Sequence, residues 1–142
     1  MKHFFRIIIV CSIIGVCFLA SCRYPAQPTP PYTRMQGKWL LVQTATDDNN
    51  NGVLDRSELI NVPPNDITYL SFNKDLTGTE NVTYNDTTTN YSFTWSLTNG
   101  DSILVRIEEG DSIVSHIDDI NNTDLTLKDN TTPVASWELY RK

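Results

Sequence analysis

Alternating apolar and polar residues in YSFTWSL, residues 91–97, constrain the fold of this chain more than any other feature. Tyr91, Phe93, Trp95 and Leu97 share one face, and serine and threonine occupy the other, as expected for a strand buried on one side. Short runs of this kind recur from Gly37 onward, separated by clusters of Asn, Asp, Gly and Thr, without helical periodicity of useful length. The sequence therefore predicts an all-β antiparallel domain.

Eight strands are predicted, and most of the links between them are short enough only for hairpins. The predicted strands are residues 38–45, 67–73, 78–84, 90–97, 102–107, 112–118, 124–127 and 135–141. A consecutive meander leaves two unpaired edges, which closure into a barrel removes. We therefore expect a closed eight-stranded barrel, with a two-sheet β-sandwich as the alternative.

Turn residues predict the register of the central hairpins. A three-residue loop ending at Gly100 would pair Trp95 with Ile103, whereas a two-residue Asn-Gly loop would turn Arg106 into the barrel. Burial favours the first register, because it keeps the arginine in water. The same reasoning predicts a three-residue loop ending at Gly110.

The N-terminus indicates export. Lys2 and Arg6 precede an apolar run, residues 7–19, which has the length of a signal-peptide core and is shorter than the about 20 residues of a membrane span. The following LASC, residues 19–22, resembles the lipobox of bacterial lipoproteins. That resemblance implies a signal peptide over residues 1–21 and a diacylglycerol and acyl chain, such as palmitate, on Cys22, which would anchor the protein to a membrane.

Residues 22–36 are predicted to be the lipidated cysteine and a tether. Four prolines between residues 25 and 31 favour extended backbone, which would hold the folded domain away from the lipid. Arg23 follows the cysteine where the familiar sorting rule would place Asp for retention in the inner membrane. We therefore expect an envelope lipoprotein of the outer membrane, facing either the periplasm or the cell surface.

Cysteine usage and charge narrow the possible partners. Cys11 and Cys17 lie inside the predicted signal peptide and Cys22 would be acylated, so the mature chain has no disulfide. The formal net charge of −6 falls to −8 when Lys2 and Arg6 are removed. Such an acidic domain is a poor partner for nucleic acid.

The sequence DDNNNGVLDRSE, residues 47–58, has the spacing of a twelve-residue calcium loop. Gly52 stands at the sharp bend in position 6, while Pro63 and Pro64 leave no room for the second helix of an EF-hand. We expect a structural site of weak affinity, about 0.1 to 1 mM; the alternative is a solvated acidic turn. The predicted Ca²⁺ ligands are the side chains of Asp47, Asn49, Asn51, Asp55 and Glu58 and the backbone carbonyl of Val53.

Three motifs resemble the lipocalin superfamily: GKW at residues 37–39, YLSFNKDLTGT at 69–79 and WELYRK at 137–142. The likeness is closer to the small lipocalin-like lipoproteins of bacteria, and it implies a barrel over residues 37–142 with the acidic loop in the position of the lid. It also implies that Arg141 stacks on Trp39. In this reading a small apolar ligand is bound among Trp39, Phe72, Phe93, Trp95 and Trp137.

The sequence does not predict an enzyme. Ser115 and His116 in SHIDD are adjacent strand residues, which face opposite ways and cannot act together as nucleophile and base. An eight-stranded barrel is only just wide enough for its own side chains, so the predicted ligand-binding aromatics could equally be a packed core. The alternative function is therefore a non-enzymatic structural or protein-interaction module of the envelope.

Overall fold

The structure, a computed structural model, describes residues 30–142, so the predicted signal peptide and Cys22 lie outside the described residues. The eight predicted strands are present as β1 and β3–β9, with one further short strand, β2. The elements are α2 (Pro31–Met35), β1 (Gly37–Thr46), η1 (Arg56–Glu58), β2 (Leu59–Asn61), β3 (Ile67–Phe72), β4 (Thr77–Tyr84), β5 (Thr87–Thr98), β6 (Ile103–Glu108), β7 (Asp111–Ile120), β8 (Asp124–Asp129) and β9 (Ser136–Arg141).

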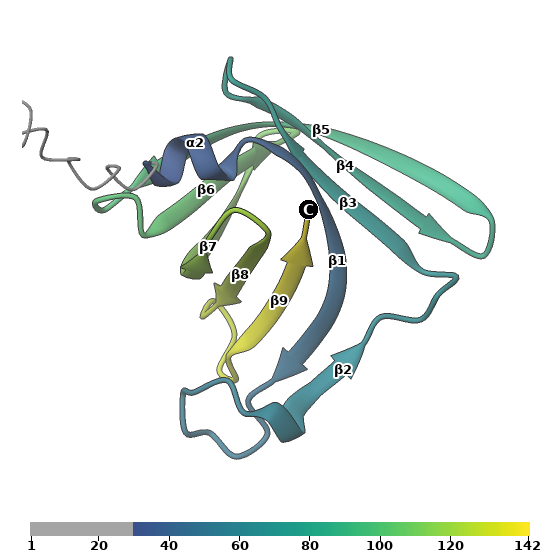
Figure 1. The fold of residues 1–142 in the computed structure, drawn as a ribbon, viewed down its shortest axis with the longest axis vertical. Helices are drawn as coiled ribbons and strands as arrows, with labels where there is room; N and C mark the ends of the chain where they lie inside the picture. The colour runs from purple at the N-terminus through teal and green to yellow at the C-terminus, as the bar shows by residue number, and fades with distance from the viewer. Residues whose placement is uncertain (1–29) are drawn as a thin grey trace, which may run out of the picture.

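The strands form a closed antiparallel barrel (Figure 1). Each strand from β3 to β9 pairs with its neighbour in sequence, and β1 pairs with both β3 and β9. The β1–β9 seam runs from Leu40 opposite Arg141 to Thr46 opposite Ser136, with a bulge after Leu41. This closure confirms the predicted eight-stranded barrel over the sandwich alternative, and β2 adds a short extra pairing to β1.

Helix α2 closes one end of the barrel. Pro31 begins it, a position where the missing N–H of proline costs nothing, and Met35 is fully buried. The Met35 carbonyl accepts a hydrogen bond of 2.7 Å from Trp39 Nε1, and Arg34 Nη1 donates to the carbonyl of Ile120 at 2.6 Å. The predicted tether of residues 22–36 is therefore wrong at its end, because residues 31–35 are helical and packed on the barrel.

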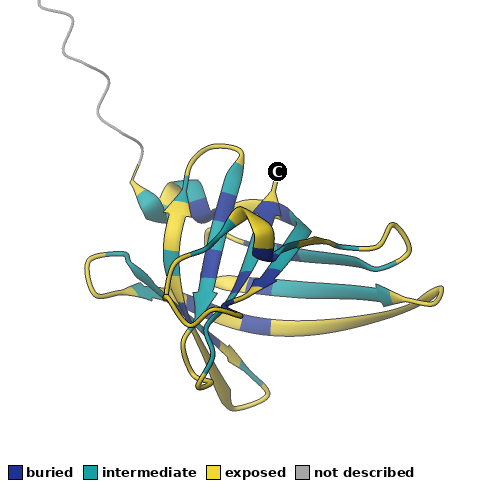
Figure 2. Ribbon diagram, turned by 90° about the horizontal axis from the view of Figure 1, so that it is seen from below, coloured by how far each residue is buried: buried dark blue, intermediate teal, exposed yellow. Residues whose placement is uncertain are grey.

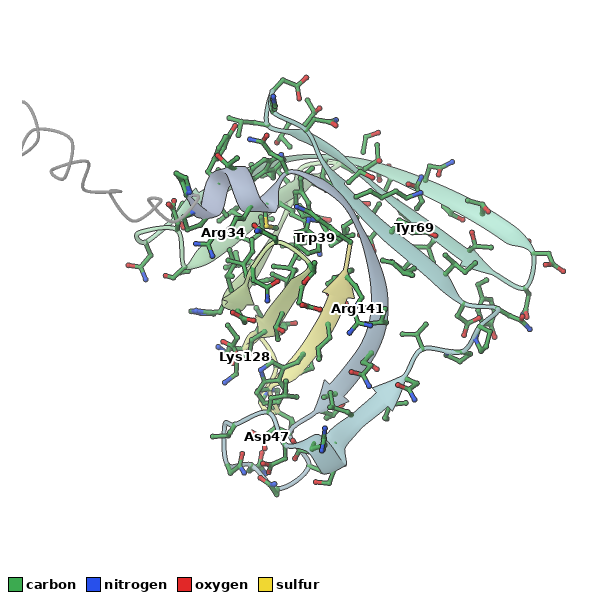
Figure 3. All side chains as sticks on the ribbon, viewed as in Figure 1. Arg34, Trp39, Asp47, Tyr69, Lys128 and Arg141 are labelled. Atoms are coloured by element: carbon green, nitrogen blue, oxygen red, sulfur yellow. The ribbon has the colours of Figure 1, made fainter. Side chains whose placement is uncertain are left out.

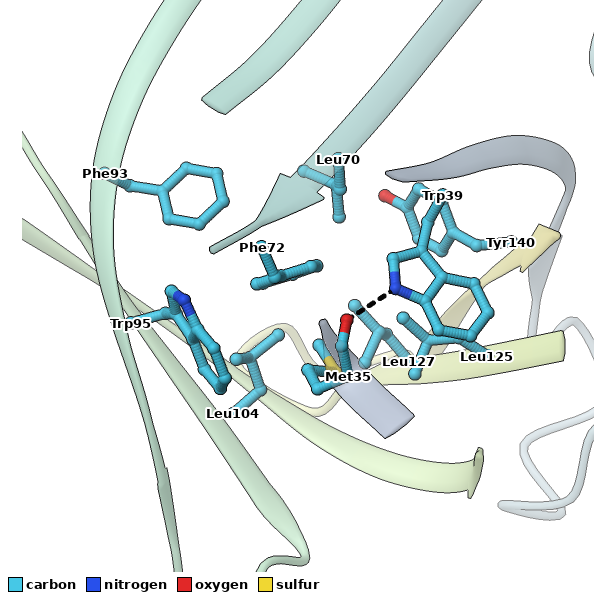
Figure 4. Packing of buried hydrophobic residues seen from close by; sticks show 10 residues of the cluster. All are labelled: Met35, Trp39, Leu70, Phe72, Phe93, Trp95, Leu104, Leu125, Leu127 and Tyr140. Atoms are coloured by element: carbon cyan, nitrogen blue, oxygen red, sulfur yellow. Dashed lines mark hydrogen bonds between the residues drawn. The ribbon is translucent and has the colours of Figure 1, made fainter. Parts of the chain in front are cut away.

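Met35 of α2 and nine buried barrel residues pack together as one hydrophobic core (Figure 4). The Phe72 ring lies edge-on to Phe93 and to Trp95, with centroids 5.5 and 5.4 Å apart, and Tyr32 of α2 stacks on Trp95 at 5.1 Å. Such offset and edge contacts add to the stabilisation from burial. The buried core consists of Met35, Trp39, Leu70, Phe72, Phe93, Trp95, Leu104, Leu125, Leu127 and Tyr140.

The predicted register of the β5–β6 hairpin is wrong. Thr98 pairs with Ile103 across a four-residue connection, so Trp95 lies opposite Arg106 and the arginine points into the barrel. Left-handed backbone at three of the four connecting residues, Asn99, Gly100 and Asp101, permits this longer turn.

The β6–β7 connection, by contrast, is shorter than predicted. Only Glu109 and Gly110 separate the paired residues Glu108 and Asp111, and both turn residues have positive φ, as a two-residue hairpin with a primed turn requires. Arg106 consequently lies opposite Ile113 on the inner face of the barrel.

The β4–β5 hairpin extends away from the barrel and is exposed over residues 87–92 (Figure 2).

Candidate functional site

A cavity of about 120 Å³ lies inside the barrel, toward the end opposite α2. We call it the polar chamber, because five of its seven lining residues are polar or charged. Strands β6 to β9 provide the whole lining, and the Asp129 and Ser136 side chains stand where the β8–β9 connection begins and ends. The lining residues are Arg106, Ile113, Ser115, Leu127, Asp129, Ser136 and Glu138.

Arg106 is the central charged group of the polar chamber. It is 6% exposed, and its Nη1 lies 3.0 Å from Glu80 Oε2 on β4. The guanidinium carbon is 5.6 Å from the centre of the Phe93 ring, which offers a second favourable contact for a buried cation. Its buried Nε finds no hydrogen-bond partner among residues 30–142, so the arginine retains an unused donor.

Tyr140 and Glu138 are joined on the inner face of β9, where Glu138 lines the polar chamber and Tyr140 belongs to the core. The Tyr140 hydroxyl donates a hydrogen bond of 2.9 Å to Glu138 Oε2. Burial, helped by the negative charge of Glu138, raises the pKa of Tyr140 well above its ordinary value. The tyrosine therefore remains a neutral donor and fixes one oxygen of the glutamate.

The aromatic residues predicted to bind a ligand do not line the polar chamber. Trp39, Phe72, Phe93 and Trp95 are packed in the core, each at most 3% exposed. Trp137 is buried on the outer face of β9, because its neighbours Ser136 and Glu138 point inward to the chamber. The rings of Phe72, Phe93 and Trp95 pack on one another, and the lining of the enclosed space is mostly polar.

Outside the barrel, Trp137 is held by two charged side chains. Its Nε1 donates to Asp118 Oδ2 at 2.7 Å, and Lys128 Nζ lies 4.8 Å from its ring centre. Trp137 and Arg141 do alternate onto one face, as predicted, but this face is the outer one.

The predicted stacking of Arg141 on Trp39 is wrong by one residue. Lys142 Nζ lies 4.3 Å from the centre of the Trp39 ring and donates to the carbonyl of Arg34 at 2.8 Å. Arg141 instead points outward, with its Nε 3.3 Å from Asp124 Oδ1 (Figure 3). Tyr140 takes the inward position on β9. Because side chains alternate along the strand, Lys142, two residues later, is the basic residue that reaches over the barrel end.

Residues 47–58 fold into a loop held by its own side chains. Asp47, 4% exposed, accepts hydrogen bonds from the backbone N–H groups of Asn51 (3.0 Å) and Gly52 (2.8 Å). Glu58, 8% exposed, accepts from the N–H groups of Asp48 (3.1 Å) and Asp55 (3.2 Å). The two buried carboxylates thus close the loop from both ends.

Two further predicted calcium ligands, Asn49 and Asn51, converge on Asp55. The side-chain amides of Asn49 and Asn51 donate to Asp55 Oδ2 at 2.8 and 2.9 Å. Within residues 30–142, no three or more His, Cys, Asp or Glu side chains are grouped so as to hold a metal ion. The predicted set of side-chain and carbonyl oxygens fits Ca²⁺ by chemistry, but here N–H groups satisfy its carboxylates.

The loop docks beside the barrel end and not over the polar chamber. Lys128 Nζ donates to the Gly52 carbonyl at 2.8 Å, and the Asp47 N–H donates to the Ala135 carbonyl at 2.9 Å. The loop therefore lies against β8 and β9 (Figure 3), and among the described residues none from 47–58 lines the chamber. The lid position implied by the lipocalin resemblance does not describe this loop.

Ser115 and His116 are separated by the sheet, as strand alternation predicts. Ser115 is 6% exposed and lines the polar chamber, whereas His116 is exposed on the outer face.

In the described part of the chain, no helix has the length and apolar character to cross a membrane.

Comparison with known proteins agrees with this architecture. The family model described as "Lipocalin-like domain" matches residues 35–127. The chain belongs to the lipocalin-like domain family. Lipocalin-like barrels suggest binding of a small ligand, and the family is generally non-enzymatic. No curated protein matches the sequence.

Two solved structures show the same lipocalin-like fold. A lipocalin-like protein from Bacteroides uniformis ATCC 8492 aligns with a TM-score of 0.58 and 16% identity, over 77% of this chain and 98% of that one. An uncharacterized protein from Bacteroides eggerthii DSM 20697 aligns with a TM-score of 0.56 and 10% identity, over 76% of this chain and 98% of that one. At these identities the likeness concerns the fold alone.

Proposed function

We propose that this lipocalin-like protein is a lipid-anchored binding protein of the bacterial envelope that holds a small polar ligand in the polar chamber. The observation that carries the proposal is a cavity inside the barrel with a 6% exposed arginine, Arg106, in its wall. A buried charge with an unused donor is costly unless a partner reaches it. A polar ligand fits better than the apolar ligand expected from sequence, because the aromatic half of the barrel is filled.

Equilibrium dialysis against a small-molecule extract of bacterial envelopes tests the binding function. The mature chain is compared with a Ser136→Phe variant, in which a bulky ring fills the polar chamber at the start of β9. Compounds enriched by the wild-type chain and not by Ser136→Phe are the expected result. Equal recovery with both chains, at matched circular dichroism, would contradict binding in the chamber.

We further propose that acylated Cys22 provides membrane attachment at the outer membrane. The LASC motif and the preceding export signal support this proposal, as does Arg23 in the position after the cysteine. Mass spectrometry of the N-terminal peptide should find a diacylglycerol and an acyl chain on Cys22, and a Cys22→Ala variant should leave the membrane fraction. An unmodified N-terminal peptide would contradict lipidation.

Calcium binding by residues 47–58 is proposed as a structural reinforcement. It is supported by ligand spacing and by the folding of the loop around Asp47 and Glu58. Calorimetry of the mature chain with calcium, magnesium or chelator should give a calcium-specific rise in melting temperature. An Asp47→Asn, Glu58→Gln double variant should lose that rise, although its melting temperature is already lower because four loop hydrogen bonds are weakened. No shift at millimolar calcium would contradict the site.

The alternative function, protein interaction, is supported by apolar side chains exposed on the outer surface. Leu76, Ile107 and Val114 are 40%, 49% and 37% exposed. A photoactivatable cross-linker at position 107 in living cells would capture a partner docked on this surface, and a matched cross-linker at exposed Thr88 on the β4–β5 hairpin is the control. Absence of a specific cross-linked product would contradict an interaction through this face.

A further inference from the structure

We propose that the ligand of the polar chamber is a small organic amine that also carries a hydrogen-bond acceptor, such as a hydroxyl or carbonyl oxygen. This inference rests on the proposed binding function and specifies the chemistry of that same site. It follows from the charges, the unused donor and the size of the chamber, each of which limits the ligand independently.

The charge balance of the polar chamber favours a cation. Arg106, Asp129 and Glu138 line the chamber, and Glu80, outside the lining, pairs with Arg106, so one positive and three negative charges give a formal balance of −2. One oxygen of Glu80 is engaged by Arg106 at 3.0 Å, and one of Glu138 by Tyr140 at 2.9 Å. Asp129 Oδ1 accepts from the Thr131 N–H at 2.7 Å. The remaining oxygens of Asp129 and Glu138 in the lining can accept from an ammonium group, and charge-assisted hydrogen bonds of this kind are the stronger ones.

Two residues at the β6–β7 turn, outside the lining of the chamber, carry the same sign of charge. Glu108 follows Arg106 on the inner face of β6, and Asp111 precedes Ile113 on the inner face of β7. These two carboxylates are directly opposite each other in the register. Like charges in that arrangement destabilise a sheet, and a cation close to them relieves the repulsion. Like charges on one end of the barrel also attract an oppositely charged ligand to that end.

The unused donor of Arg106 sets the second requirement. Its Nε is buried without a partner among residues 30–142, and the hydroxyls of Ser115 and Ser136 stand in the same lining. An acceptor on the ligand, or a water that it positions, supplies the hydrogen-bond partner that Arg106 Nε lacks. A simple alkylammonium ion offers no such oxygen, so an amine with an oxygen function matches the chamber better.

The volume of the polar chamber limits the ligand to a fragment-sized molecule. About 120 Å³ holds several waters, or an organic molecule of about six non-hydrogen atoms. Pockets for larger ligands typically measure about 300 Å³ or more. The chamber therefore suits a short amino alcohol or a similarly small amine.

Isothermal titration calorimetry with three probes of one chain length tests the proposal. 4-Aminobutan-1-ol carries an amine and a hydroxyl, butane-1,4-diol is its neutral counterpart, and 4-hydroxybutanoate is its anionic counterpart. The mature chain should bind the amino alcohol at least about tenfold more tightly than the other two, because charge-assisted hydrogen bonds form only with the amine. Binding should weaken about tenfold in Glu138→Gln and in Asp129→Asn, which keep the shape of each side chain.

Asp101→Asn removes one carboxylate at the opposite end of the barrel and serves as the charge-matched control, which should bind as the wild type does. Tighter binding of the diol or of 4-hydroxybutanoate would overturn the amine assignment and leave the binding function standing. Equal weakening by Asp101→Asn would overturn it too, because the effect would then reflect net charge alone. If no probe binds, and Ser136→Phe recovers the same compounds as the wild-type chain in the dialysis experiment, both the amine assignment and the proposed binding function fail.

Discussion

Lys142 shows how a single residue secures the closed end of the barrel. Its Nζ lies 4.3 Å from the Trp39 ring centre and donates to the Arg34 carbonyl. Lys142→Met should lower the free energy of unfolding by about 1 kcal/mol through loss of the cation–π contact and the hydrogen bond. Arg141→Met, which removes an exposed pair to Asp124, should cost less than about 0.5 kcal/mol. Urea unfolding checks both, and a larger loss for Arg141→Met would contradict the assignment.

Tyr140 gives the protein a specific response to alkaline pH. Burial raises its pKa in the folded chain above the unfolded value of about 10. The associated stability is therefore complete below about pH 10 and is lost as the pH rises from there toward the folded pKa. Unfolding midpoints measured from about pH 8 to 11 should fall more steeply for the wild type than for Tyr140→Phe. Parallel curves would contradict the buried, protonated hydroxyl.

Most strands follow directly from the sequence, because period-2 alternation and turn residues act locally. The register of β5 and β6 does not. The rule that arginine avoids the interior favours the wrong loop, since the partner of Arg106 is Glu80 on β4, a residue distant in sequence. The two-residue Asn-Gly loop, which turns Arg106 into the barrel, is the only feature of the sequence analysis that indicates the polar chamber. The same limitation hides the packing of α2, whose five residues show no periodicity and are fixed by contact with the barrel.

Gly78 on β4 tests how tightly the strands pack. It pairs directly with Phe93, and an added Cβ would overlap the Phe93 ring and approach the carbonyl oxygen of Ser71 to 2.6 Å. Gly78→Ala should therefore destabilise the barrel by about 1 to 3 kcal/mol. Thermal unfolding measures this loss. In the Phe93→Leu background the same substitution should cost less, because the smaller side chain makes room; an unchanged cost would place the strain in the backbone.

Closure joins a strand near the N-terminus to the last strand, so the whole barrel depends on contacts that are distant in sequence. The glycine-x-tryptophan segment and the C-terminal WELYRK were sufficient to predict that β1 and β9 meet. They do not distinguish Lys142 from Arg141, because Trp137 faces outward and alternation counted from it follows the outer face of β9. Calcium binding by residues 47–58 stays a prediction, because the loop is closed by its own N–H groups, whereas the polar chamber follows only from the three-dimensional register.

The charge of the entire molecule leads to a final prediction. The chain has a formal net charge of −6, and −8 without Lys2 and Arg6, so self-repulsion opposes the compact state. Raising the sodium chloride concentration from about 10 to 150 mM shortens the screening distance from about 30 to 8 Å and should raise the melting temperature by a few degrees, with chelator present to remove calcium. Glu138→Gln should respond less, because one interior carboxylate is already neutral. A melting temperature that falls with salt would instead mean that attractive pairs such as Arg106 with Glu80 outweigh the repulsion, and that the acidic groups of the chamber are already compensated.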